Sequence, residues 1–162
     1  MISIFTTGGT IDKVYFDANS EFHVGDPQVQ PILTEAGVIV AFQVNSLLKK
    51  DSLDMTDEDR KLVADQVYRC PNQKIIITHG TDGMTATARV LASEGLADKK
   101  TVIFVGAMQP ARMRYSDAAF NLGFSLAAVQ LLGNGIYVAM NGRIFSHDRV
   151  IKNLTAGRFE AP

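Results

Sequence analysis

The sequence contains a single cysteine, Cys70, among its 162 residues. One cysteine excludes an intramolecular disulfide and any zinc site built from several cysteines. We therefore expect a buried or idle thiol. A chain of this length can bury a hydrophobic core without disulfides or metal. The sequence predicts a single domain over residues 1–162.

The sequence also lacks an excess of either positive or negative charge. Lysine and arginine number 16 against 17 aspartate and glutamate residues, and the formal net charge is −1. Nucleic acids and anionic membrane surfaces attract proteins mainly through clustered cationic side chains. Since no long block of like charge is present, we expect neither kind of partner.

Several other signals are missing. No apolar run is long enough to span a bilayer, and the chain opens on residues 2–5 without the pattern of a secretory signal, so we expect a cytoplasmic protein. His23, His79 and His147 lack metal-ligand spacing, which argues against a metal site. The glycines form neither a dinucleotide fingerprint nor a Walker loop, so no cofactor is expected.

Five short apolar runs are present, and most are continuous rather than alternating. Such runs are typical of strands that are buried on both faces of a parallel sheet. The expected strands are residues 2–5, 38–44, 74–78, 101–105 and 136–140.

Helical patterns lie between these runs, at residues 28–36, 56–69, 84–94 and 116–132. Thr56, with Asp59 three residues later, predicts a capped start, and Ser116 is expected to cap the last helix. Gly95 and Gly133 are expected stops. The alternation of strands and helices predicts an α/β fold with a doubly wound, mostly parallel sheet of flavodoxin-like type.

Residues 12–26 fit neither pattern. The segment is too long and too polar for a tight turn between a strand and a helix. We interpret it as a mobile loop or a hairpin, because long loops in compact domains often act as lids.

Glycines and polar side chains follow each predicted strand. Ligands of open parallel sheets bind beyond the carboxyl ends of the strands, so these segments are expected to share one cleft. The segments contain Thr10 after the first strand, Ser52 after the second, Thr81 and Asp82 after the third, Ala107 after the fourth and Lys152 after the fifth.

This set of residues suits acyl transfer. A threonine hydroxyl becomes a useful nucleophile when a base takes its proton or the backbone positions it. Gly8, Gly9 and Gly80 let the chain approach a ligand closely, and freed backbone N–H groups can hold an oxyanion. A lysine beside Asp82 and Thr81 can shuttle a proton.

Each segment also has a purely structural interpretation. Gly8 and Gly9 could only turn the chain, and residues 79–82 could only open a helix with Thr81 or Asp82 as N-cap. Ser52 could be a turn residue, and Lys152 could be a solvated surface lysine. The individual patterns do not decide between these alternatives.

Two motifs together resemble a known family. Residues 7–11 read TGGTI and residues 77–82 read ITHGTD, which resemble the two signatures of the bacterial-type L-asparaginases. The resemblance extends through residues 105–108, 120–122 and 140–152, and covers the chain from residue 2 to about 159. It implies hydrolysis of L-asparagine to L-aspartate and ammonia through a threonine acyl-enzyme, without cofactor or metal.

The resemblance also assigns roles by position. Thr10 matches the nucleophile, and Thr81, Asp82 and Lys152 match the second triad, which activates the attack. Asp82 would also meet the substrate's α-amino group, and Ser52 its α-carboxylate. The backbone around Gly80 and Ala107 would line the amide pocket.

Several positions depart from the family pattern. Gly83 stands where a threonine is usual. Leu53 replaces a glutamine that contacts substrate. Phe22 aligns with the lid tyrosine, so we expect Tyr15 to supply that hydroxyl from the near side of the loop.

The chain resembles the family's N-terminal domain alone, as in short-chain members. In classical members a second domain contributes to a neighbouring subunit's site. Without one, a homodimer is expected.

Three functions remain open from the sequence. The leading one is an amidohydrolase acting on L-asparagine, with L-glutamine or another amide as alternative substrate, because one methylene gives little discrimination. The second is a non-catalytic module that binds aspartate or asparagine. The third is an amidase component for a macromolecular substrate, which the near-neutral charge disfavours.

Overall fold

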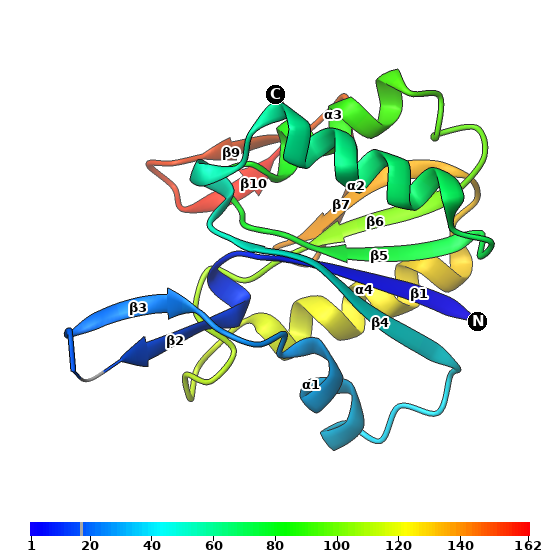
Figure 1. The fold of residues 1–162 in the computed structure, drawn as a ribbon. Coiled ribbons are helices and arrows are strands. Elements are labelled where there is room, and N and C mark those ends of the chain that lie inside the picture. The colour runs from blue at the N-terminus through cyan, green and yellow to red at the C-terminus, as the bar shows by residue number, and fades with distance from the viewer. Residues whose placement is uncertain (17) are drawn as a thin grey trace.

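A six-stranded sheet forms the centre of the molecule, in the order β4-β1-β5-β6-β7-β8 (Figure 1). The computed structural model describes residues 1–16 and 18–162. The strands of this sheet are β1 (Ile2–Gly8), β4 (Phe42–Lys50), β5 (Lys74–Thr78), β6 (Thr101–Val105), β7 (Gly135–Met140) and β8 (Arg143–Ser146). All but β8 pair in parallel. The parallel strands follow the flavodoxin-like order, second-first-third-fourth-fifth, which confirms the predicted fold class.

Helices cover both faces of the sheet. Figure 1 shows α1 (Val29–Glu35) and α4 (Ala118–Leu131) on one face, and α2 (Asp57–Arg69) and α3 (Met84–Ser93) on the other. Each face has its own hydrophobic core. Strand β5 contributes side chains to both cores, because successive side chains of a strand point to opposite faces of the sheet. Ile75 and Ile77 join the core that contains Val63, whereas Ile76 joins the core that contains Leu122.

The helix boundaries largely follow the sequence signals. Thr56 and Asp59 form the predicted capping box at the start of α2. Gly95, with a φ of +70°, follows the end of α3 in the left-handed conformation that favours glycine. The prediction for Ser116 was wrong by one residue: Asp117 is at the N-cap position of α4. Ser116 Oγ still accepts a hydrogen bond from Ala118 N–H.

The strand predicted at residues 38–44 has different bounds in the structure. Strand β4 begins at Phe42 and continues to Lys50. The apolar residues Val38 and Val40 precede it and pack against a core without being part of a strand. Because β4 is an edge strand, paired only with β1 in the sheet, its side chains are partly exposed and its second half can be polar.

Three short strands lack the continuous apolar pattern and were not predicted. Strand β8 closes one edge of the sheet, and β9 (Ile151–Asn153) pairs with β10 (Arg158–Glu160) in a separate antiparallel hairpin. The β9–β10 hairpin carries Lys152, so it bears directly on the site.

The segment at 12–26 contains an antiparallel hairpin of β2 (Lys13–Phe16) and β3 (Glu21–Val24). In Figure 1 the hairpin projects from the body of the molecule. Residue 17, which is part of the expected loop, lies outside the described residues. The hairpin interpretation is confirmed; its closure over the site stays a prediction.

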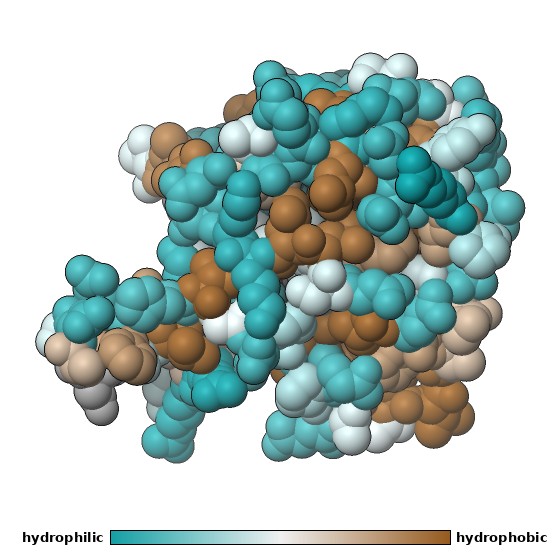
Figure 2. Space-filling model, in the orientation of Figure 1, coloured by the Kyte–Doolittle hydropathy of each residue, from teal (hydrophilic) through white to brown (hydrophobic). Residues whose placement is uncertain are grey.

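The surface is chemically mixed. Figure 2 shows hydrophilic residues over α2 and apolar residues reaching the surface between α2 and β4. No helix in the described part of the chain is both long enough and apolar enough to cross a membrane.

Candidate active site

Two loops meet backbone to backbone where β1 and β5 end. Gly9, at φ +86°, follows β1, and a Cβ atom added to it would lie 2.5 Å from the Gly80 nitrogen. Just before this contact, Thr7 Oγ1 donates a hydrogen bond of 3.0 Å to the Thr78 carbonyl. These contacts bring the turns that precede Thr10 and Thr81 together.

A third loop packs against the second. Ser52 begins a short 3-10 turn, η2 (Ser52–Asp54), and is buried. A Cβ on Gly80 would lie 2.5 Å from Ser52 Oγ, and this oxygen accepts a 3.0 Å hydrogen bond from Gly83 N–H. Side chains larger than hydrogen are therefore excluded at Gly80, and Ser52 is held against the segment that carries Thr81.

Lys152, on the β9–β10 hairpin, contacts the segment that carries Thr81 and Asp82. Its Nζ lies 2.8 Å from Thr81 Oγ1 and 2.6 Å from Asp82 Oδ1. The Lys152 side chain is 15% exposed and the Asp82 side chain 37%. The structure thus brings together the three residues of the expected second triad. The N-cap interpretation of Thr81 and Asp82 was wrong, because Gly83 takes that position.

Thr10 opens a one-turn 3-10 helix, η1 (Thr10–Asp12), and is half-buried. It lies one residue beyond Gly9, and Thr81 lies one residue beyond Gly80. In the part of the chain that the structure describes, no hydrogen-bond acceptor is found for the Thr10 or the Thr81 N–H. Two threonines and two unused backbone donors therefore gather at this edge.

The loop after β6 completes the set. Ala107 is fully buried, and Asn121 Nδ2 donates a 3.0 Å hydrogen bond to the Gly106 carbonyl. Leu53 is 76% exposed and lines a hollow of about 360 Å³ beside Asp82 and Lys152. The replacement of glutamine by Leu53 thus leaves an aliphatic side chain at the rim of the site.

Tyr15 is not brought into contact with the threonines. It lies on β2, is 53% exposed, and its ring centroid is 5.4 Å from that of Phe22, its cross-strand partner. Its hydroxyl makes no hydrogen bond to Thr10 or Thr81 within the described residues. However, Lys13, on the same face of β2, forms a 2.7 Å ion pair with Asp51, beside Ser52.

Sequence reasoning missed two buried titratable residues near the site. The first is Asp12, whose carboxylate accepts a 2.9 Å hydrogen bond from Gln28 N–H. Burial raises the pKa of the Asp12 carboxyl to about 6, although this hydrogen bond and the Lys49 cation act in the opposite direction. The Asp12 carbonyl also accepts a backbone hydrogen bond from Gly25, so this residue ties both ends of the β2–β3 hairpin together.

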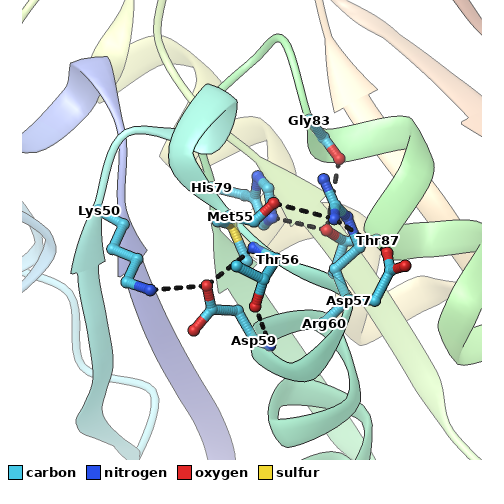
Figure 3. Close-up of polar contacts among 9 residues, drawn as sticks. All are labelled: Lys50, Met55, Thr56, Asp57, Asp59, Arg60, His79, Gly83 and Thr87. Carbon is cyan, nitrogen blue, oxygen red and sulfur yellow. Dashed lines mark hydrogen bonds and ion pairs between the residues drawn. The ribbon is translucent and has the colours of Figure 1, made fainter.

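The second is His79, which was considered only as a metal ligand. Its Nδ1 lies 2.8 Å from the Gly80 carbonyl. Its Nε2 lies 2.8 Å from Thr87 Oγ1 (Figure 3). The pKa of the His79 imidazole is lowered to about 4, mainly by burial and to a smaller extent by the Arg60 cation, although the hydrogen bond to the Gly80 carbonyl acts in the opposite direction. The signals in the sequence were its place directly after a strand with three consecutive isoleucines and its place in the motif ITHGTD.

The described residues contain no cluster of three or more histidine, cysteine, aspartate or glutamate side chains that could hold a metal ion.

Comparison with known proteins gives a consistent relationship. The family model "Asparaginase, N-terminal" matches residues 1–161. A probable periplasmic L-asparaginase of Haemophilus influenzae is 31% identical over 95% of this chain and 46% of its own length. A glutamyl-tRNA(Gln) amidotransferase component of Methanococcus vannielii is 40% identical over 96% of this chain and 37% of its own length.

A solved structure agrees. The probable cytoplasmic L-asparaginase of Campylobacter jejuni superimposes with a TM-score of 0.82 and 29% identity, over 99% of this chain and 52% of that one. The chain spans less than half the length of the two curated relatives. Both the family model and the fold agree, so the chain belongs to the asparaginase family and corresponds to its N-terminal domain.

Proposed function

We propose that this protein is an amidohydrolase that converts L-asparagine and water into L-aspartate and ammonia. The observation that carries the proposal is the position of Lys152 Nζ, within 2.8 Å of Thr81 Oγ1 and 2.6 Å of Asp82 Oδ1. A hydroxyl in contact with a cation–carboxylate pair at the carboxyl edge of a parallel sheet is suited to proton transfer.

The reaction proceeds in two halves. The Thr10 hydroxyl attacks the amide carbon and loses its proton to Thr81. Lys152 gives an ammonium proton to the leaving nitrogen as it receives the Thr81 proton, so the charge of Lys152 is unchanged. The carbon–nitrogen bond breaks, ammonia leaves, and an ester on Thr10 remains. Water then hydrolyses the ester and restores the hydroxyl.

Backbone donors stabilise the charge that develops. The N–H groups of Thr10 and Thr81 have no acceptor within the described chain and lie in the two loops that meet at Gly9 and Gly80. They can donate to the amide oxygen as it becomes an oxyanion. Asp82 holds Lys152 beside Thr81 during the transfer.

Substrate contacts come from neighbouring loops. Ser52 Oγ accepts from Gly83 N–H, and its own proton is free to be donated to the α-carboxylate. Asp82 carries the charge for the α-amino group, and the backbone around Gly80 and Ala107 lines the amide pocket. Tyr15 reaches the site only if the β2–β3 hairpin closes over it.

Two other functions have specific support. The similarity to an amidotransferase component favours an amidase for a different amide, such as L-glutamine. The low net charge argues against nucleic acid as partner. A module that binds aspartate without turnover is favoured by the exposed, aliphatic Leu53. The intact set of Thr10, Thr81, Asp82 and Lys152 favours catalysis over this alternative.

Assembly and location form part of the proposal. We infer a homodimer in which a second copy contributes to the substrate contacts. Relatives are named as both periplasmic and cytoplasmic proteins. We propose a cytoplasmic location, like that named for the Campylobacter jejuni relative.

Ammonia release from L-asparagine tests the function, with L-glutamine and D-asparagine in parallel. We expect turnover that disappears in Thr10→Ala and Thr81→Ala and falls about 10²- to 10⁴-fold in Lys152→Met. Lys61→Met is the control, because among the described residues Lys61 pairs with the surface carboxylates of Asp65 and Glu94. Wild-type protein that binds L-aspartate but releases no ammonia from any amide would support the binding module instead.

A further inference from the structure

We propose that His79 is a positioning residue that sets the orientation of the Gly80–Thr81 peptide and so directs the Thr81 N–H into the cleft. The inference rests on the proposed amidohydrolase function. It assigns a role to a buried side chain that the reaction scheme itself does not use.

The hydrogen bonds fix which nitrogen carries the proton. A carbonyl oxygen can only accept, so the 2.8 Å contact with the Gly80 carbonyl requires a hydrogen on His79 Nδ1. In a neutral ring Nε2 must then accept, and the Thr87 hydroxyl 2.8 Å away donates to it. Thr87 Oγ1 also lies 3.3 Å from the Gly83 carbonyl, but its single proton goes to the shorter contact.

The surroundings keep this ring neutral. His79 is fully buried, and its ring packs edge-on against Phe104. The charged side chain that faces it is Arg60 of α2, which donates a 3.1 Å hydrogen bond to the Met55 carbonyl (Figure 3). A second cation beside Arg60 in this apolar environment is unfavourable. The Nδ1–H form is therefore maintained at neutral pH.

The hydrogen bond from His79 to the Gly80 carbonyl also sets the direction of the Thr81 N–H, because both groups belong to the same planar peptide. In a trans peptide the carbonyl and the following N–H point in opposite directions, and the described chain has no cis bond. When His79 holds the Gly80 carbonyl toward the interior, the Thr81 N–H must point away from the interior. No acceptor within the described residues takes that N–H, so it is available to a substrate oxygen.

The other end of the segment is fixed independently. Ser52 Oγ accepts from Gly83 N–H, and the Gly83 carbonyl accepts from Thr87 N–H. The two residues between these anchors, Thr81 and Asp82, are the ones that contact Lys152. His79 and Ser52 together hold the segment rigid, which is what preorganised oxyanion stabilisation requires.

Variants with and without a donor at Nδ1 test the role. In His79→Asn the side-chain amide can still donate to the Gly80 carbonyl, whereas His79→Leu fills the space without a donor. We expect kcat for L-asparagine to fall about 10²- to 10³-fold in His79→Leu, with KM nearly unchanged, and to recover at least tenfold in His79→Asn. Ser125→Ala, which removes a buried hydrogen bond on α4, is the control.

A readout without turnover separates this inference from the proposed function. We expect ¹⁵N NMR of wild-type protein at pH 7 to show the Nδ1–H tautomer of His79. Added L-aspartate should shift the Thr81 amide resonance in wild-type protein and His79→Asn but not in folded His79→Leu. An Nε2–H tautomer, an equal Thr81 shift in His79→Leu, or wild-type kcat in that variant would overturn the role.

Discussion

At the scale of single residues, the site depends on glycines as much as on hydroxyl groups. Gly9 and Gly80 touch backbone to backbone, and Gly80 also touches Ser52. A side chain at either glycine would push apart the loops that carry Thr10 and Thr81. The resemblance in the sequence is strongest at these turns, because the chemistry needs the close approach that only glycine permits.

Gly9→Ala tests this dependence. The added Cβ would meet Gly80, and the combination of φ +86° and ψ −173° is a glycine-specific conformation that costs another residue about 1–3 kcal/mol. We expect loss of ammonia release together with a fall in the free energy of unfolding, measured by urea denaturation.

Gly37→Ala is the matched control for Gly9→Ala. Gly37 has φ +66°, but a Cβ there would have no neighbour within 4 Å. It should lose some stability because of its positive φ but keep full activity. Equal activity in the two variants would mean that the contact at Gly9 is unimportant.

At the scale of elements, the sequence predicts what local patterns determine. Continuous apolar runs placed β5 and β6 at their observed bounds, and capping placed the start of α2. The short strands β8, β9 and β10 have no such pattern, since their pairing depends on distant partners. The predicted start of β4 was too early, because the apolar residues before the strand pack on the core without joining the sheet.

The same distinction applies to the site. Thr10, Ser52, Thr81 and Lys152 could be placed because they follow strands whose carboxyl ends share an edge. The roles of Asp12 and His79 could not, because a lone polar residue is identified as buried only when the elements that cover it are known.

One buried carboxylate, that of Asp12, lies at the base of the β2–β3 hairpin. Asp12 binds the Gln28 N–H, and its carboxyl has a pKa of about 6 against the ordinary 3.8. The folded state therefore binds this proton more tightly than the unfolded state between these pH values. Its contribution to stability is present at low pH and is lost as the pH rises through 6.

Asp12→Asn should remove this pH dependence while it keeps an acceptor for Gln28. We expect the variant to gain up to about 3 kcal/mol in free energy of unfolding relative to wild type between pH 4 and pH 8. Urea denaturation at both pH values measures the gain, and the contribution of His79 cancels in the comparison. A constant difference between the two proteins would show that Asp12 has an ordinary pKa.

At the scale of the whole molecule, the question is how the site is completed. The chain matches less than half the length of its curated relatives. Beside Asp82 and Lys152 lies a hollow of about 360 Å³ whose aliphatic walls include the exposed Leu53 and Leu154. Exposed aliphatic side chains next to charged groups are suited to contact with another copy.

We therefore expect self-association that is coupled to activity. Sedimentation should give a monomer–dimer equilibrium, and activity per chain should rise over the same concentration range. Leu154→Asp should shift both curves to higher concentration, whereas Leu131→Asp, an equally exposed leucine on α4, should shift neither. Full activity per chain in a strictly monomeric protein would show that one copy is sufficient.

The most direct test of the account is whether Thr10 becomes acylated during turnover. L-asparagine is mixed with the protein and the reaction is quenched in acid within milliseconds. The protein is then digested, and the masses of its peptides are measured by mass spectrometry. We predict an added aspartyl group on the peptide that contains Thr10, absent in Thr10→Ala and removed when the substrate is exhausted. Turnover with the acyl group on Thr81, or turnover that persists in Thr10→Ala, would contradict the account.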